Sequence, residues 1–214
     1  MCSMILPSSS IEVERKFVPG PDVEGRLHDL GAVLLKELVF CDSYYDSPDL
    51  LLTTRDLWLR KRDHSWELKH PPKRGTLGLS GASTQYREVN CEAEIISRVS
   101  EELGVPCPLS LDSLPLQEFA TFVTRRRRFQ IPQSGDSRHS VIVDLDMADF
   151  GFEVGEVEVL VDTQDEVENA LQEVEEICKK MGVLSDSPVP GKMSTFLRLN
   201  RTEHYNRLRE AHVL

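Results

Sequence analysis

The sequence predicts an α+β protein that is mainly β, with eight antiparallel strands that can close into a barrel and helices on its flanks. Eight short segments have the side-chain alternation of strands, and hairpin connections dominate between them. Helical periodicity is confined to the intervals 22–34, 92–120 and 164–213. Closure into a barrel removes the exposed edges of such a sheet. Because no linker, repeat or low-complexity tract interrupts the pattern, we expect residues 1–214 to form one domain.

In the first half of the chain, turn residues separate the predicted elements. A strand over 10–18 is closed by Pro19-Gly20-Pro21, and Asp22 can cap a helix over 22–34. A short helical turn is expected at 49–54 and an exposed loop, rich in Pro, Gly and Ser, at 71–83. The other predicted strands in this half span 35–45, 55–62, 66–70 and 84–90.

In the second half of the chain, helices and strands are expected in two blocks. A helix over 92–103 ends at Gly104, and a Leu-rich segment over 110–120 is predicted to form a second helix. Three strands follow, and a helix over 164–181 has an acidic first half and lysines near its end, as the helix dipole favours. The strands span 121–131, 139–147 and 152–161, and one or two terminal helices span 192–213.

Composition limits the classes of function. The net charge of −11 argues against nucleic-acid binding, which needs a basic surface, and against docking on anionic membranes. The five cysteines have neither metal-ligand nor redox spacing, so reduced thiols are expected. No signal peptide or membrane-spanning stretch is visible, and we therefore expect a cytoplasmic monomer.

Charged residues alternate along several predicted strands. In the first strand Glu12, Glu14 and Lys16 share one face, and the other face is mostly apolar. Acids two residues apart on a strand place both carboxylates on one face, about 7 Å apart. The acidic pairs are Glu12/Glu14, Asp144/Asp146 and Glu156/Glu158. The bases on such faces are Lys16, Arg60, Arg62, Lys69 and one or two of Arg125–Arg128, with Lys192 beyond the strands.

These faces are either solvated or line a charged interior. Exposed ion pairs contribute little to stability, and nothing forbids them. Like charges repeated on three strands repel, however, and the opposite faces of the same strands are apolar enough to lie under helices. Carboxylates in a lumen suit a hard cation such as Mg²⁺, and Arg and Lys suit phosphate oxygens. The pattern therefore favours a metal-dependent polyphosphate site over a solvated sheet.

Aromatic residues and the arginine run leave alternatives open. Alternation lets at most two of the four arginines point inward. One interpretation is that Trp58 and Tyr86 are packing residues, which is the most frequent role of aromatic side chains. Trp58 shares its face with Arg60, however, so it could stack on a heterocycle or a cationic ring at the mouth of a lumen. One of Tyr44 and Tyr45 must face inward and could contact phosphate.

The segment Glu12-Val13-Glu14-Arg15-Lys16 resembles the Glu-x-Glu-x-Lys signature of the CYTH superfamily, the triphosphate tunnel metalloenzymes. The resemblance spans nearly the whole chain, since further motifs follow in order: Leu59-Arg60-Lys61-Arg62, Glu67-Leu68-Lys69, a basic strand, Asp144-Leu145-Asp146, Glu156-Val157-Glu158 and Lys192. The sequence in and around these motifs is most similar to the animal branch of the superfamily, which acts on thiamine triphosphate. The similar segments are Ile11–Phe17, Asp42–Asp46, Trp58–Arg62, Trp66–Lys69 and Gly155–Glu158.

The resemblance implies a closed eight-stranded antiparallel tunnel with distinct sets of residues in its lumen. The implied Mg²⁺ ligands are Glu12, Glu14, Asp144, Glu156 and Glu158. The implied triphosphate-binding residues are Lys16, Arg60, Arg62, Lys69, Arg126 and Lys192, with Arg125 or Arg128 as alternatives to Arg126. Trp58 and Tyr86 are candidates for holding the thiamine rings, and Asp146 and Tyr44 for supporting the ligands or taking part in catalysis.

The implied reaction is hydrolysis of thiamine triphosphate to thiamine diphosphate and phosphate. The same site would also suit inorganic tripolyphosphate hydrolysis or cyclisation of ATP, as in other branches of the superfamily. A non-catalytic sensor of polyphosphate would keep the bases but need fewer acids, and an acidic scaffold would have no pocket. The retained acidic pairs favour a metal and therefore chemistry.

Overall fold

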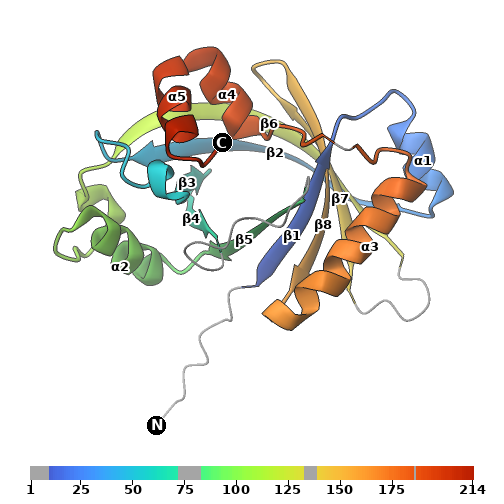
Figure 1. The fold of residues 1–214 in the computed structure, drawn as a ribbon, viewed down its shortest axis with the longest axis horizontal. Coiled ribbons are helices and arrows are strands. Elements are labelled where there is room, and N and C mark those ends of the chain that lie inside the picture. Colours follow the sequence, from blue (N-terminus) through green and yellow to red (C-terminus); the bar gives the residue numbers. More distant parts are fainter. Residues whose placement is uncertain (1–9, 72–82, 133–138, 186) are drawn as a thin grey trace, which may run out of the picture.

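The computed structural model describes residues 10–71, 83–132, 139–185 and 187–214, and within them eight strands close into an antiparallel barrel (Figure 1). Neighbours around the barrel follow the order β1-β5-β4-β3-β2-β6-β7-β8, and β8 pairs with β1 to close it. The strands are β1 (Ile11–Phe17), β2 (Val33–Asp46), β3 (Trp58–Arg62), β4 (Ser65–His70), β5 (Ser83–Val89), β6 (Gln117–Ile131), β7 (Val141–Ala148) and β8 (Phe152–Val161). The predicted α+β class and the closed barrel are confirmed.

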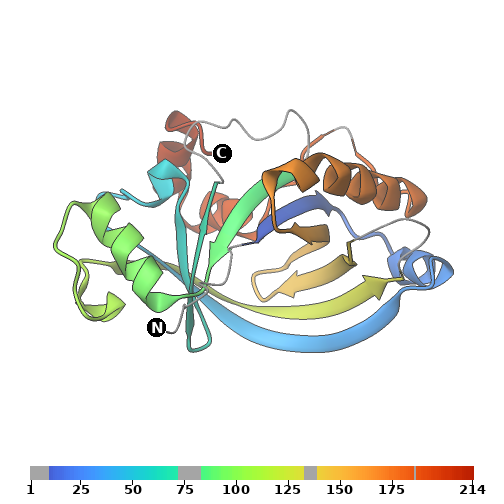
Figure 2. The same cartoon turned by 90° about the horizontal axis from the view of Figure 1, so that it is seen from below.

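Helices pack on the outside of this barrel. The α-helices of the described residues are α1 (Val23–Asp29), α2 (Glu92–Leu103), α3 (Val167–Lys180), α4 (Lys192–Asn200) and α5 (Thr202–Glu210). Three 3₁₀ turns accompany them: η1 (Thr53–Arg55), η2 (Leu111–Ser113) and η3 (Gln164–Glu166). In Figure 1, α3 runs along the outside of β1 and β8, and Figure 2 shows the long strands β2 and β6 sweeping together along one wall. In the described part of the chain, no helix is both long and apolar enough to cross a membrane.

Two predicted helices are corrected by the structure. The helix expected over 22–34 ends at Asp29, because Gly31 turns the chain with φ +72° and β2 already begins at Val33. The helix expected over 110–120 is wrong: η2 spans three residues, and β6 begins at Gln117 to pair with β2. The loop expected at 71–83 falls largely outside the described residues.

Apolar side chains cover the outer wall of the barrel. One core packs β1, β6, β7 and β8 against α1 and α3, with Val13 and Val157 fully buried. A second packs Leu59 and Leu68, from β3 and β4, against α2. Burying about 100 Å² of apolar surface contributes about 2.5 kcal/mol, so these faces are held outward against the helices. The alternating residues of the same strands must therefore point into the lumen.

The seam between β1 and β8 requires a glycine. A Cβ added to Gly155 would lie 2.1 Å from the Phe17 ring, far inside contact distance. Phe17 is itself buried and lies directly opposite Gly155 in the β1–β8 register. The aromatic ring thus packs on bare backbone, which holds the two strands that carry most of the acids in one register.

Candidate functional site

The barrel lumen contains a cavity of about 450 Å³ lined by charged and aromatic side chains. Thirteen of the fifteen residues predicted for the site line it: Glu12, Glu14, Lys16, Tyr44, Trp58, Arg60, Arg62, Lys69, Tyr86, Arg126, Glu156, Glu158 and Lys192. The other two, Asp144 and Asp146, are buried and lie behind this wall in contact with basic side chains. The structure therefore brings all fifteen residues into one region of the lumen.

Strand register sets like charges beside each other on one wall. Glu14 lies directly opposite Glu158 across β1 and β8, and Asp144 lies opposite Glu156 across β7 and β8. Lys16 also lies opposite Glu156, so that base and acid meet at the edge of this wall. Because like charges directly opposite each other are unfavourable, this arrangement depends on nearby cations.

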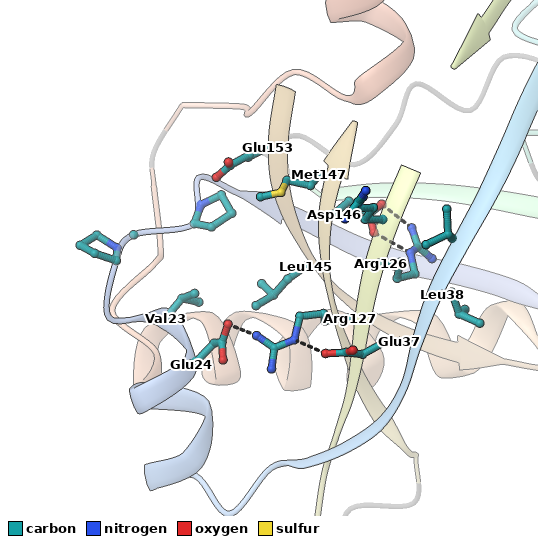
Figure 3. A pocket seen from close by; sticks show the side chains of 15 residues that line it. Val23, Glu24, Glu37, Leu38, Arg126, Arg127, Leu145, Asp146, Met147 and Glu153 are labelled. Carbon is teal, nitrogen blue, oxygen red and sulfur yellow. Dashed lines mark hydrogen bonds and ion pairs between the residues drawn. The ribbon is translucent and has the colours of Figure 1, made fainter. Parts of the chain in front are cut away.

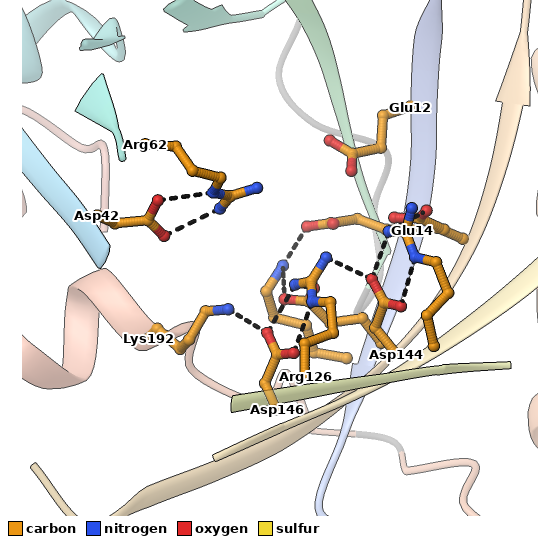
Figure 4. A network of polar contacts seen from close by, with 12 residues as sticks. Glu12, Glu14, Asp42, Arg62, Arg126, Asp144, Asp146 and Lys192 are labelled. Carbon is orange, nitrogen blue, oxygen red and sulfur yellow. Dashed lines mark hydrogen bonds and ion pairs between the residues drawn. The ribbon is translucent and has the colours of Figure 1, made fainter. Parts of the chain in front are cut away.

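Two arginines of β6 hold the acids of β7. Arg126 donates two hydrogen bonds of 2.6 Å to Asp146 (Figure 4). Arg128 donates hydrogen bonds of 2.8 and 2.6 Å to Asp144. Arg126 also donates to Glu156 at 3.3 Å. The even-numbered arginines of the run are thus the inward pair, and both Arg126 and Arg128 reach the cavity.

The three lysines of the site each contact a carboxylate. The pairs are Lys16 with Glu14, Lys69 with Glu12, and Lys192 with Asp146. Lys192 is the first residue of α4, so this helix delivers its base from outside the barrel (Figure 4). Such charge-assisted contacts are about twice as strong as neutral hydrogen bonds. They provide Glu12, Glu14 and Asp146 each with a cationic partner.

The opposite wall, on β2 to β5, holds a second group of ion pairs. Arg62 donates hydrogen bonds of 2.7 and 2.9 Å to Asp42, which is completely buried. Arg60 donates to Glu67 at 2.6 Å and pairs with Glu88 at 3.5 Å. The three acids were not predicted as site residues. Side-chain alternation along the strand from Tyr44 could have identified Asp42 as an inward residue. Its partner, Arg62 of β3, can be identified only when the pairing of β2 with β3 is known.

Phe40 is a further lumen residue that the sequence did not identify. Its ring centre lies 4.1 Å from the Arg62 guanidinium carbon, 5.5 Å from that of Arg126 and 5.9 Å from the Lys192 ammonium. Cations within about 6 Å of an aromatic ring are attracted to its face. Phe40 therefore gathers three bases from β3, β6 and α4 around one side of the cavity.

Electrostatic effects shift the pKa values of two acids of β8 in opposite directions. Burial, together with the charges of Glu12 and Asp144, raises the pKa of Glu158 to about 8, against the opposing effect of Arg128. Burial would also raise the pKa of Glu156, but Lys16 and the other surrounding bases outweigh it and lower that pKa. The bases near Glu158 are therefore too few to favour its ionised form, whereas the bases around Glu156 stabilise its negative charge.

The acid cluster fits a hard divalent cation by its chemistry. Glu12, Glu14 and Glu158 offer oxygen donors alone, which Mg²⁺ prefers, and a bound cation would relieve the raised pKa of Glu158. Within the described ranges, no three acidic, histidine or cysteine side chains already form a metal-binding group. Lys16 and Lys69 contact Glu14 and Glu12 in this structure.

Aromatic residues form another part of the cavity wall. Trp58 lies opposite Lys69 across β3 and β4, and Tyr86 lies opposite Glu12 across β1 and β5. The aromatic pair thus borders the charged part of the lumen. Tyr44 is the inward tyrosine of its pair, since it lines the cavity, whereas Tyr45 packs outside. Burial raises the pKa of Tyr44, so its phenol keeps its proton.

An outer groove of about 540 Å³ lies on the other side of β6 and β7. Figure 3 shows Arg127 there, between Glu24 and Glu37, while Arg126 points away toward Asp146. The odd-numbered arginines Arg125 and Arg127 line this groove and not the lumen. The groove is slightly larger than the cavity, but it has neither the stacked acids nor the aromatic pair of the lumen, so volume alone does not locate the site.

Comparison with known proteins agrees with this geometry. The CYTH domain matches residues 10–191, and the chain belongs to this family of metal-dependent tunnel enzymes. It is 41% identical over 209 residues to the thiamine-triphosphatase of Macaca fascicularis and 40% identical to that of Homo sapiens, covering 94% of this chain and 90% of each relative. A protein of Pyrococcus horikoshii OT3 shares the fold, with a TM-score of 0.61 over 88% of this chain and 99% of its own, at 20% identity.

Proposed function

We propose that this protein is a hydrolase that converts thiamine triphosphate to thiamine diphosphate and phosphate, with Mg²⁺ as its cofactor. The observation that carries the proposal is the combination, in one cavity, of a wall of acids, a set of bases and an aromatic pair. Relatives named thiamine-triphosphatase at 40–41% identity over nearly the whole chain support the choice of substrate.

The bases of the lumen would bind the triphosphate chain. They are Lys16, Arg60, Arg62, Lys69, Arg126 and Lys192, and Arg128 is added because it reaches the same cavity. Each already contacts a carboxylate, so binding exchanges carboxylate oxygens for phosphate oxygens without leaving a buried base unpaired. Arginine suits this exchange because its planar guanidinium makes two-pronged contacts.

The acids would hold Mg²⁺ and the attacking water. Glu12, Glu14, Asp144, Glu156 and Glu158 would supply the metal's ligands, with Asp146 supporting Arg126 and Lys192 behind them. Bound Mg²⁺ supplies positive charge that polarises the phosphoryl oxygens. Asp144 is completely buried beneath Arg126 and Arg128, so it reaches a ligand only as these arginines turn toward phosphate.

The hydrolytic step needs a water aligned with the terminal phosphorus. Its oxygen forms a bond to that phosphorus as the bridging P–O bond breaks and thiamine diphosphate leaves. A carboxylate of the acid cluster takes the proton that the water loses. Tyr44, which keeps its own proton, would donate a hydrogen bond to a phosphate oxygen, and Trp58 and Tyr86 would hold the thiamine rings.

A phosphate-release panel tests the proposal. Thiamine triphosphate, inorganic tripolyphosphate and ATP are each incubated with the protein, with Mg²⁺ and with EDTA. We expect Mg²⁺-dependent release that is fastest from thiamine triphosphate. Faster release from tripolyphosphate would assign the site to the inorganic substrate, and a phosphate-dependent thermal shift without release would assign it to a non-catalytic sensor.

Substitutions test the assignment of the acids. Glu12→Gln and Glu158→Gln should each lower Mg²⁺-dependent release about 100-fold or more, because each removes a charged oxygen ligand. Glu153→Gln is the matched control, because Glu153 is an exposed acid on the same strand as Glu158. Full activity in either lumen variant would show that the metal assignment is wrong.

Substitution of the two tryptophans tests the assignment of the organic group. Trp58→Ala should weaken the use of thiamine triphosphate and spare tripolyphosphate, since Trp58 lines the cavity. Trp66→Ala is the control, because Trp66 packs outside the barrel against Tyr45. Equal losses with both substrates in the Trp58 variant would remove the stacking role.

We also propose that residues 1–214 act as one cytoplasmic, monomeric domain with no nucleic-acid or membrane partner.

A further inference from the structure

Asp56 lies beside the aromatic pair but is outside the charged network of the lumen. Its Oδ1 atom accepts a hydrogen bond of 2.8 Å from the Trp58 indole and one of 3.0 Å from the Tyr86 hydroxyl. Trp58 belongs to β3 and Tyr86 to β5, which are separated in the barrel by β4. One carboxylate oxygen thus connects two aromatic residues across three strands.

The backbone at Asp56 fixes where this carboxylate points. Asp56 ends η1 in the left-handed conformation with φ +61°, and its N–H donates to the Thr53 carbonyl at 3.0 Å. Asp and Asn tolerate this conformation better than most residues. Trp58 follows two residues later as the first residue of β3, so turn and strand hold the indole and its acceptor in one short segment.

The directions of the two hydrogen bonds are set by chemistry. An indole N–H can only donate. Burial, with the charge of Asp56, raises the pKa of Tyr86 well above its ordinary value, so the phenol keeps its proton and donates as well. Burial also raises the pKa of Asp56, against the hydrogen bonds from Trp58 and Tyr86. Asp56 therefore acts as the shared acceptor for two fixed donors.

We propose that Asp56 is a positioning residue that determines specificity for the organic end of the substrate. By holding Trp58 and Tyr86 in fixed orientations, it forms the aromatic wall before the ligand arrives and so reduces the entropy lost on binding. The wall borders the phosphate-binding part of the cavity through Lys69 and Glu12, which lie opposite the two aromatic residues. The inference deepens the proposed function, on which the identity of the bound ring rests.

Substitution at Asp56 separates positioning from a general effect on the site. Asp56→Ala removes the shared acceptor, and we expect the KM for thiamine triphosphate to rise about tenfold while kcat and tripolyphosphate hydrolysis stay within twofold. Asp56→Asn keeps an acceptor oxygen and tolerates the left-handed backbone, so we expect it to stay within twofold of wild type. Tyr86→Phe keeps the ring but loses one donor, and should raise the KM about threefold.

Two activity results would overturn the proposal. One is an equal loss with both substrates in Asp56→Ala, and the other is an Asp56→Asn variant as impaired as Asp56→Ala. If Asp56→Ala does not fold, the comparison of Tyr86→Phe with Asp56→Asn decides, because the proposal requires the former alone to raise the KM. These outcomes apply once the wild-type protein has been shown to hydrolyse thiamine triphosphate.

A fluorescence measurement tests the positioning role without any substrate. The chain has two tryptophans, so Trp66→Phe leaves Trp58 as the single emitter. Loss of the acceptor in Asp56→Ala should add a nanosecond component to the anisotropy decay of Trp58, and Asp56→Asn should not. An unchanged decay in Asp56→Ala would refute the positioning role, even if the proposed function held. A changed decay would support it, even if thiamine triphosphate proved not to be the substrate.

Discussion

The raised pKa of Glu158 predicts that the metal-free protein loses stability as the pH rises. Its ordinary pKa of 4.5 is raised to about 8 in the folded protein, so the folded state binds the proton more tightly than the unfolded state. That contribution is fully present below pH 4.5 and is lost as the pH rises through 8. A difference of about 3.5 pH units at about 1.4 kcal/mol each sets an upper limit of roughly 5 kcal/mol.

Glu158→Gln mimics the protonated carboxyl and should remove much of this pH dependence. Because the pKa of Glu158 depends on the neighbouring charges, which remain in the variant, we expect Glu158→Gln to recover only about 2 kcal/mol of the stability lost between pH 5 and pH 9. This corresponds to about 4–8 °C in Tm for a chain of this length. The measurement is urea unfolding in EDTA at several pH values, with the exposed Glu153→Gln as control. If the free energy of unfolding changed with pH in the same way for the wild type and for Glu158→Gln, the reasoning would be refuted.

Three further predictions concern the lumen and its seam. Arg126→Gln should lower kcat/KM with thiamine triphosphate at least 100-fold, and Arg125→Gln should stay within twofold, because only the former lines the cavity. Phe40→Leu should raise the KM for thiamine triphosphate and for tripolyphosphate about fivefold, because three bases lose their contact with the aromatic ring. Phosphate release is the assay. Gly155→Ala should lower the free energy of unfolding by about 3 kcal/mol, measured in urea, because its Cβ would overlap the Phe17 ring.

Side-chain alternation allowed much of the site to be predicted. Acids two residues apart on β1, β7 and β8 had to share a face, and the apolar residues between them identified that face as the inner one. The same rule limited the inward arginines to two, which are Arg126 and Arg128 in the structure. Local pattern was sufficient here because each strand carries its own charged and apolar faces.

Features that depend on pairing between distant strands were not predictable in this way. Asp42 receives its arginine from β3, and Asp56 receives the Tyr86 hydroxyl from β5. The Leu-rich composition of 110–120 favours a helix, but Leu111 and Leu114 lie in and just after a short 3₁₀ turn, where they pack into the core shared by β3, β4 and α2. The β2–β6 ladder then takes up the chain from Gln117.

The closure of the barrel by β1 has a consequence for how the protein is made. Ile11 pairs with Val161, about 150 residues later in the chain, and contacts of such high sequence separation form slowly. At roughly 5–20 residues per second, a ribosome needs on the order of 10–30 s after producing β1 before β8 exists. During that time β5 can already pair with one edge of β1, but the edge that pairs with β8 has no partner and the barrel is not closed. The site is therefore complete only after β8 and then α4, which carries Lys192, have been made, and until then the edge of β1 that pairs with β8 stays open.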